Sequence, residues 1–191
     1  SPTGTGKTLC LLCASLAYLK YERDRLIKER EKNDLKLEVI DKTERIRQPV
    51  IFYTSRTHAQ LSNVIKELRK TCYEPINCVI SSRDQMCVNP LYNSFHGNVL
   101  NLKCKFAQKT SNPNRCKYFK GKKEWGKKNS FCPFFFERDK IQHSDMIFMP
   151  YNYIFDPAIR TRITNLHMEN SILIIDEAHN IQEVCNDSVS R

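Results

Sequence analysis

Four short apolar runs along the chain predict the strands of a buried sheet. They are Val50–Thr54, Cys78–Ile80, Met146–Met149 and Ile172–Ile175. Each run is nearly continuous in apolar residues rather than alternating, which is typical of parallel strands covered on both faces. The pattern therefore favours an α/β fold with a parallel sheet.

Apolar residues at helical spacing lie between the first two runs. Within His58–Lys70 they are Leu61, Val64, Ile65 and Leu68. Their spacing of three and four predicts an amphipathic helix. Leu9–Leu19 is also apolar and follows a glycine-rich stretch, so we expect a buried helix there. Strand, helix and strand in this order predict a doubly wound α/β sheet.

Two polar stretches interrupt the pattern. Lys20–Gln48 carries ten basic and eight acidic residues, and we expect a charged surface helix or loop without an assigned function. Ser82–Arg138 has four cysteines and little apolar periodicity, so something other than a hydrophobic core must hold it together. We predict one domain from 1–81 and 139–191, an inserted domain at 82–138, and a charged insertion at 20–48.

The positive charge of the chain is concentrated in the second insertion. The segment from Ser81 to Phe136 contains eleven Lys and Arg residues but only two acidic residues, Asp84 and Glu124. This segment therefore accounts for +9 of the net charge of +10. Such a field indicates a polyanionic partner, nucleic acid first, although a solvated lysine-rich loop is the alternative. No run reaches the roughly 18 apolar residues that span a bilayer, so we expect no membrane partner.

The chain opens on a candidate phosphate-binding loop, Ser1-Pro-Thr-Gly-Thr-Gly-Lys-Thr8, which departs from the usual pattern only where Ser1 stands for glycine. Its glycines let successive N–H groups turn toward phosphate oxygens. The expected nucleotide contacts are Thr3, Gly4, Thr5, Gly6, Lys7 and Thr8. Among these, Lys7 would reach the β- and γ-phosphates and Thr8 would bind Mg²⁺. A glycine turn before a helix, without nucleotide, is the alternative. No strand precedes the loop, so we expect a fragment.

A second candidate site follows the last apolar run, in Ile172-Leu-Ile-Ile-Asp-Glu-Ala-His179. Asp176 at the end of a buried strand would hold Mg²⁺, and Glu177 would polarise the water that attacks the γ-phosphate. A surface pair of acids is the alternative. Because α/β proteins bind ligands at the carboxyl edge of the sheet, this strand end and the opening loop are expected to meet.

Asp-Glu-Ala-His resembles motif II of superfamily 2 helicases, in which His179 would couple the nucleotide state to the rest of the motor. Tyr53-Thr-Ser-Arg-Thr-His-Ala-Gln-Leu61 resembles motif Ia of the same superfamily. That resemblance implies contacts to the phosphates of a nucleic-acid strand from Thr54, Ser55, Arg56 and Thr57. Thr57 is also suited to capping the helix that follows, and the two roles are compatible.

Four of the nine cysteines lie in the basic insertion. Cys87, Cys104, Cys116 and Cys132 are separated by 16, 11 and 15 residues. Zinc sites more often use close Cys-x₂-Cys pairs, so spacing leaves open both a metal centre and unligated thiols. We expect structural thiols at the other five positions, Cys10, Cys13, Cys72, Cys78 and Cys185.

Four cysteines between motifs Ia and II resemble the insertion of the iron–sulfur helicases, the group of the xeroderma pigmentosum D and Fanconi anaemia J helicases. Ser81–Cys87, Phe131–Phe135 and Asp145–Tyr153 carry the same resemblance. It implies a RecA-like motor domain that uses ATP and Mg²⁺, and a [4Fe–4S] cluster held by the four cysteines. It further implies a nuclear DNA helicase that moves 5′ to 3′ along one strand. Its DNA partners would be single strands and duplex junctions.

Repair, recombination and telomere maintenance are the processes implied by this resemblance. Two rival hypotheses stay open. One is an iron–sulfur or zinc module that binds nucleic acid and uses ATP as a switch without unwinding. The other is an ATPase that acts on RNA or remodels proteins.

Overall fold

The computed structural model describes residues 6–32, 49–109, 111–119, 131–163, 166 and 168–189. The chain divides into two compact units, the first from residues 1–77 and 143–191 and the second from residues 78–142. The predicted insertion, 82–138, lies within the second unit. In the described part of the chain, no helix is both long and apolar enough to cross a membrane.

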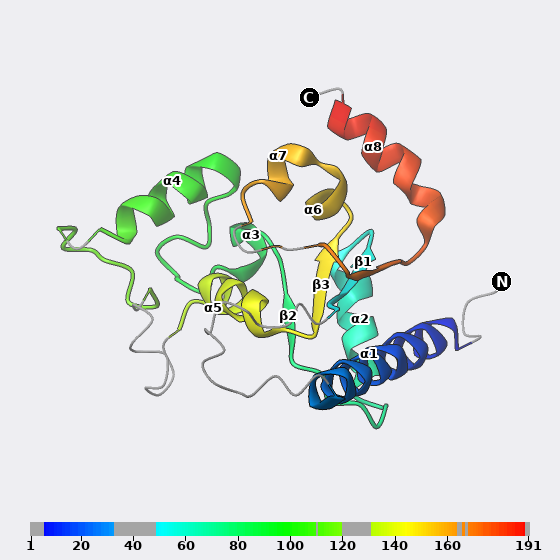
Figure 1. Cartoon of the computed structure of the whole chain (residues 1–191). Helices are drawn as coiled ribbons and strands as arrows, with labels where there is room; N and C mark the ends of the chain where they lie inside the picture. Colours follow the sequence, from blue (N-terminus) through cyan, green and yellow to red (C-terminus); the bar gives the residue numbers. More distant parts are fainter. Residues whose placement is uncertain are drawn as a thin grey trace. The chain divides into compact units, whose positions relative to one another are not determined.

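A parallel sheet forms the centre of the first unit (Figure 1). β1 (Ile51–Ser55) pairs in parallel with β3 (Met146–Pro150) and with β4 (Ile172–Ile175). The strand order is β2-β3-β1-β4. In β2 (Asn77–Val79), Asn77 belongs to the first unit, and Cys78 and Val79 belong to the second. Every residue of β1 and β3 is buried, as expected of strands covered on both faces. The predicted α/β fold with a parallel sheet is confirmed.

The strand register brings three strand ends to one edge of the sheet. Thr54 in β1 lies opposite Met149 in β3 and Ile175 in β4. The observed strands begin and end within one residue of the predicted ones. The residues that follow β1, β3 and β4 therefore gather at the carboxyl edge, where α/β proteins place their ligands.

Helix α1 (Lys7–Lys32) is longer and less buried than expected. Leu12, Leu16 and Leu19 are buried on one face, whereas Leu11 and Tyr18 are 42% and 49% exposed on the other. The predicted helix over Leu9–Leu19 is confirmed, but it is buried on one face only, because the apolar run is wider than the face that packs.

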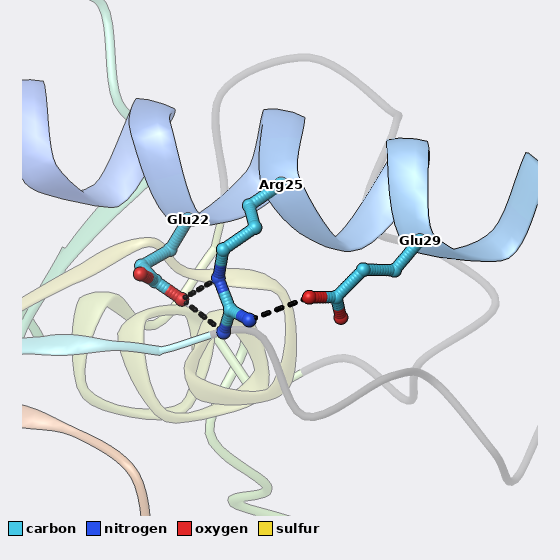
Figure 2. A network of polar contacts seen from close by, with 3 residues as sticks. All are labelled: Glu22, Arg25 and Glu29. Carbon is cyan, nitrogen blue, oxygen red and sulfur yellow. Dashed lines mark hydrogen bonds and ion pairs between the residues drawn. The ribbon is translucent and has the colours of Figure 1, made fainter. Parts of the chain in front are cut away.

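Charged residues continue α1 into the predicted charged insertion. Arg25 donates to Glu22 on one side, at 2.7 and 3.1 Å, and to Glu29 on the other, at 2.7 Å (Figure 2). The hydrogen bond with Glu22 is the main reason why the pKa of Arg25 is raised. Pairs at spacings of three and four stabilise an exposed helix, so this part of the insertion is a solvated helix. Residues 33–48 lie outside the described residues.

Helix α2 (His58–Leu68) begins with a reciprocal cap. The Thr57 hydroxyl accepts a hydrogen bond from the Gln60 backbone N–H, while the Gln60 side chain accepts one from the Thr57 N–H. Leu61, Val64 and Leu68 are buried, and the helix packs against α1, β1 and β3. The periodicity in the sequence predicts this element and its buried face correctly.

The rest of the first unit consists of short helices. α6 (Asn152–Phe155) follows β3 and contacts α7 (Pro157–Arg160) and α8 (Ile181–Val189), while η3 (Ala178–Asn180) leads from β4 into α8. Asp156 caps α7 by accepting from the N–H groups of Ala158 and Ile159.

The second unit contains more regular structure than its sequence predicts. α3 (Arg83–Met86) contacts both α4 (Gly97–Ala107) and α5 (Pro133–Lys140), and η2 (Ile141–His143) leads back to the first unit. Leu100, Ala107, Phe134 and Ile141 are buried. The local period of the sequence does not reveal these helices, and the prediction that something other than a hydrophobic core holds 82–138 together stays a prediction.

Candidate functional site

The residue after each of three strands lies at the carboxyl edge of the sheet. Asp176 follows β4, and its N–H donates to the Thr54 carbonyl at 2.9 Å. Tyr151 follows β3 and donates its N–H to the Ser55 carbonyl at 3.1 Å. Arg56 follows β1. The two candidate motifs thus lie side by side because parallel strands place them there.

The described part of the opening loop begins at Gly6, since Ser1–Thr5, and with them Thr3, Gly4 and Thr5, lie outside the described residues. Gly6 has a φ of +72°, in the left-handed region that favours glycine. Its carbonyl accepts the N–H of Cys10 at 2.9 Å. Lys7 and Thr8 then form the first turn of α1.

Thr8 and Asp176 interact with Tyr53 of β1, and Lys7 interacts with Asp176. The Tyr53 side chain is fully buried, and burial and the Asp176 carboxylate both raise its pKa, while interaction with Thr8 lowers it. Its hydroxyl faces these two side chains without a hydrogen bond of standard geometry to any described residue. Lys7 in turn lowers the pKa of Asp176 by its charge. The opening loop and the late acidic strand end therefore meet.

Asp176 is held in an environment that disfavours its charge. Burial raises its pKa most, and the neighbouring Glu177 carboxylate raises it further; Tyr53 and Lys7 offset part of this. A partly desolvated carboxylate beside a second one is stabilised by a cation. The arrangement can bind a divalent ion together with the Thr8 hydroxyl.

Glu177 occupies a left-handed backbone conformation, with a φ of 53°. This conformation is uncommon for residues other than glycine. Where such a residue does adopt it, the position is often a functional site. The Glu177 carboxylate lies 3.3 Å from Nδ1 of His179.

Burial, followed by the charges of Asp176 and Glu177, raises the pKa of Tyr151 to about 12. Tyr151 and Tyr153 are buried, so both belong to the core.

The four predicted contacts to nucleic acid differ in accessibility. Thr54 and Ser55 are fully buried; their hydroxyls donate to the Ile174 carbonyl at 3.0 Å and to Oε1 of Gln60 at 2.9 Å. These two side chains stabilise the unit internally, because strand residues point into the layers beside a buried sheet. Arg56 and Thr57 are exposed.

Arg56 connects the end of β1 to the segment after Asp-Glu-Ala-His. Its guanidinium donates to Oδ1 of Asn180 at 3.1 Å and to Glu183 at 3.1 Å. Asn180 also lies 3.1 Å from Nε2 of His179. A continuous set of polar contacts thus runs from Glu177 through His179 and Asn180 to Arg56.

Four of the five cysteines of the second unit, all except Cys78, line one cavity, whose apolar wall includes Tyr92, Phe119 and Phe135. Cys87 ends α3, Cys104 lies within α4, Cys116 follows it in a loop, and Cys132 caps α5. Phe135 packs edge-on against Phe119 at 4.9 Å and Phe134 at 5.1 Å, so these aromatic rings support the cavity. Trp125 lies outside the described residues.

Side-chain amides donate to two of the four sulfur atoms. Nδ2 of Asn89 lies 3.1 Å from Sγ of Cys116, and Nε2 of Gln108 lies 3.4 Å from Sγ of Cys104. Burial raises the pKa of Cys87 and of Cys132, and backbone N–H groups oppose it, from Asn89 at the first and from Phe135 and Phe134 at the second. Such donors stabilise thiolates.

The remaining cysteines are dispersed. Only Cys78 is buried, Cys13 and Cys185 are partly buried, and Cys10 and Cys72 are exposed. Sequence reasoning missed Tyr53, Asn89 and Gln108. Tyr53 is part of a continuous apolar run, which is typical of a core residue. The position of Asn89, two residues after Cys87, is a weak indication that it lies near that thiol.

Comparison with known proteins identifies the family. The DEAD_2 family model matches residues 53–127 and 122–191. The chain belongs to the DEAD_2 family. Over its whole length it is 36% identical to the regulator of telomere elongation helicase 1 homolog of Arabidopsis thaliana and 34% identical to regulator of telomere elongation helicase 1 of Homo sapiens. It covers 21% and 18% of those proteins, about a fifth of their length.

The sequence resemblance within Ser81–Cys87, Phe131–Phe135 and Asp145–Tyr153 is to this same telomere helicase. Among solved structures, an XPD helicase matches the DEAD_2 chain with a TM-score of 0.59 at 21% identity, covering 96% of this chain and 29% of the other. A truncated XPD matches with a TM-score of 0.58 at 23% identity, covering 96% and 48%. The fold is therefore that of XPD, an α/β fold with a parallel sheet.

Proposed function

We propose that this chain is the ATP-binding part of an iron–sulfur DNA helicase. The observation that carries the proposal is that Thr8 and Asp176 interact with Tyr53, and Lys7 with Asp176, at the carboxyl edge of the sheet. Membership of the DEAD_2 family implies the use of ATP and Mg²⁺ and the binding of nucleic acid. The first unit is then a RecA-like motor domain, and the second unit is its iron–sulfur domain.

The proposed roles follow from position and chemistry. Lys7 neutralises the β- and γ-phosphates, and Thr8 and Asp176 bind Mg²⁺, directly or through water. Glu177 orients the water that attacks the γ-phosphate and accepts its proton. One acid thus binds the metal and the other serves as base. His179 couples this site to Arg56.

Cys87, Cys104, Cys116 and Cys132 would hold the iron–sulfur cluster. Among the described residues, no three His, Cys, Asp or Glu side chains converge closely enough for a single ion. A zinc site would require sulfur atoms roughly 4 Å apart, given Zn–S bonds of about 2.3 Å. Four thiols that line one cavity, two of them with amide N–H donors, suit a larger cluster in which every iron takes one thiolate. When bound, the cluster cross-links the segments of this unit.

Single-stranded DNA and duplex junctions are the proposed substrates. Arg56 and Thr57 would contact backbone phosphates, and the concentrated positive charge of 81–136 would attract the polyanion. Translocation from 5′ to 3′, a nuclear location and action in repair, recombination and telomere maintenance extend the same proposal. They are supported by the family resemblance and by the names of the relatives.

The decisive experiment uses the full-length protein with Lys7→Ala. Because Lys7 supplies the positive charge next to the phosphates, we expect DNA-stimulated ATP hydrolysis and unwinding to fall by at least about 100-fold, as when one preorganised electrostatic group is removed. Lys20→Ala, on the exposed part of α1, is the matched control and should retain both activities. Unwinding at the wild-type rate by Lys7→Ala would refute the motor proposal.

Metal analysis of anaerobically purified protein separates the helicase from a zinc module. We expect about four irons per chain, the composition of the proposed cluster, with visible iron–sulfur absorbance. One equivalent of zinc without iron would exclude the iron–sulfur helicase and leave the ATPase site in place.

A further inference from the structure

Asn89 makes an unusual number of contacts at the cysteine cavity. Its side chain is 4% exposed and its Nδ2 lies 3.1 Å from Sγ of Cys116. Its own backbone N–H interacts with the thiol of Cys87. One buried residue therefore contacts two of the four sulfur atoms, which lie in separate segments of the second unit.

The orientation of the Asn89 amide is decided by its other partner. The backbone N–H of Leu91 lies 3.0 Å from Oδ1 of Asn89. A backbone N–H can only donate, so the atom facing it must be the amide oxygen, and the atom facing Cys116 must be the NH₂ group. Asn89 is thus held as a donor toward sulfur.

The turn around Asn89 keeps this donor in place. Its carbonyl accepts the N–H groups of Tyr92 at 2.9 Å and Asn93 at 2.8 Å. The bond from Leu91 closes a local turn of the kind that Asn, Asp and Ser side chains form two residues ahead. Pro90 restricts Asn89 to extended backbone. The side chain is preorganised before any cluster is bound.

We propose that Asn89 is a positioning residue of the iron–sulfur site, which raises the reduction potential of the cluster and slows its loss through its N–H···S bond to Cys116. The inference rests on the proposed iron–sulfur function. Reduction adds negative charge to the cluster and its thiolates. A donor to sulfur stabilises the more negative, reduced form more strongly, and hydrogen bonds to sulfur are among the factors that set these potentials.

Gln108 provides a weaker version of the same contact. Its Nε2 lies 3.4 Å from Sγ of Cys104 and also donates to the Cys104 carbonyl at 3.1 Å. Because this donor is shared and its distance to sulfur is longer, we expect Gln108→Met to lower the potential less than removal of the Asn89 donor.

Two variants separate the sulfur contact from the turn. Asn89→Asp keeps an oxygen for Leu91 but removes the donor and adds negative charge. Asn89→Ser also keeps an acceptor for Leu91, yet its short hydroxyl cannot reach Cys116. Asn93→Asp makes the same charge change at an exposed position of the same loop and is the matched control.

The test uses full-length protein purified without oxygen, with a redox titration of the cluster and the rate of iron loss to a chelator as readouts. We expect the midpoint potential to fall in the order wild type, Asn89→Ser, Asn89→Asp. Iron loss from Asn89→Asp should be about 10-fold faster, the lower end of what partners of metal ligands contribute. Asn93→Asp should match the wild type.

Wild-type potentials and rates in both Asn89 variants would overturn the inference and leave the proposed function intact. If Asn89→Asp cannot retain a cluster, Asn89→Ser decides, and an unshifted potential in that variant overturns the inference. A wild-type protein without iron would instead overturn the iron–sulfur proposal together with this inference.

Discussion

Single residues at the proposed nucleotide site carry features that oppose stability. Asp176 is partly buried beside Glu177, and its pKa is raised for that reason. Glu177 adopts a left-handed backbone conformation, and the buried hydroxyl of Tyr53 has no standard hydrogen bond to a described residue. Each feature costs stability when no ligand is bound, as is common at functional sites.

At this scale we predict that Asp176→Asn stabilises the nucleotide-free protein at pH 7. A carboxyl whose pKa is raised on folding binds its proton more tightly in the folded state. Stability therefore falls as the pH rises from its ordinary pKa of 3.8 through the raised value, and stays lower above it. The uncharged amide has no such penalty, so its Tm should be higher at pH 7 and its advantage should shrink below pH 4.

The same variant should lack the rise in Tm that Mg²⁺ and ATP give the wild type, because a metal ligand is missing. Asp24→Asn, on the exposed face of α1, is the control and should change neither measurement. A lower Tm for Asp176→Asn at pH 7 would contradict the account.

At the scale of elements, β1 and α8 are linked by exposed polar contacts. Arg56 after β1 contacts Glu183 in the first turn of α8, and the two side chains are 48% and 62% exposed. Exposed pairs of this kind contribute little to stability. If Arg56 contacts DNA as proposed, a phosphate would replace Glu183 at small cost, and the Glu183 carboxylate would compete with DNA for the same guanidinium.

We predict that Glu183→Gln binds single-stranded DNA roughly 2- to 5-fold more tightly, which corresponds to the removal of one exposed ion pair. Fluorescence anisotropy at fixed salt measures the affinity. Glu67→Gln removes another ion pair, between Glu67 in α2 and Lys70 just after it, and should leave the DNA affinity unchanged. Weaker DNA binding by Glu183→Gln would mean that the ion pair holds Arg56 in its binding position.

At the scale of the whole molecule, the two units carry different chemistry. The first contains Lys7, Tyr53 and the two acids, while the second contains the cysteine cavity and most of the net charge. Lys103, Lys105 and Lys109 lie exposed on or just after α4, and Nζ of Lys103 lies 4.2 Å from the centre of the Phe95 ring. Removal of these lysines should therefore change DNA affinity without changing ATP affinity.

We predict that Lys103→Gln, Lys105→Gln and Lys109→Gln together weaken DNA binding. They should also reduce the slope of its salt dependence by roughly 0.7 for each phosphate of a single strand that these lysines neutralise in the wild type. ATP affinity in the absence of DNA should not change. A triple variant of equal charge in the first unit, with Gln at Lys20, Lys28 and Lys66, is the control. Equally weakened DNA binding in both triple variants would show that only net charge matters.

Local pattern was sufficient for much of the fold. The apolar runs predict the four strands to within one residue, because parallel strands covered on both faces are apolar throughout. The spacing of Leu61, Val64 and Leu68 predicts α2, because side-chain direction repeats every 3.6 residues in a helix. Thr57 as a cap follows from the same local chemistry. The expectations for α1 and the second unit were less accurate, because the width of a buried face depends on its neighbours.

The sequence by itself determined which elements form and which residue types are available for phosphate, metal and sulfur chemistry. Only the tertiary structure decided which of them meet: Lys7 with Asp176 at the carboxyl edge of the sheet, four dispersed cysteines at one cavity, and Asn89 against two of their sulfur atoms. It also decided that Thr54 and Ser55 face inward while Arg56 reaches α8. The reason is that strand order and loop paths, rather than spacing along the chain, bring distant residues into contact.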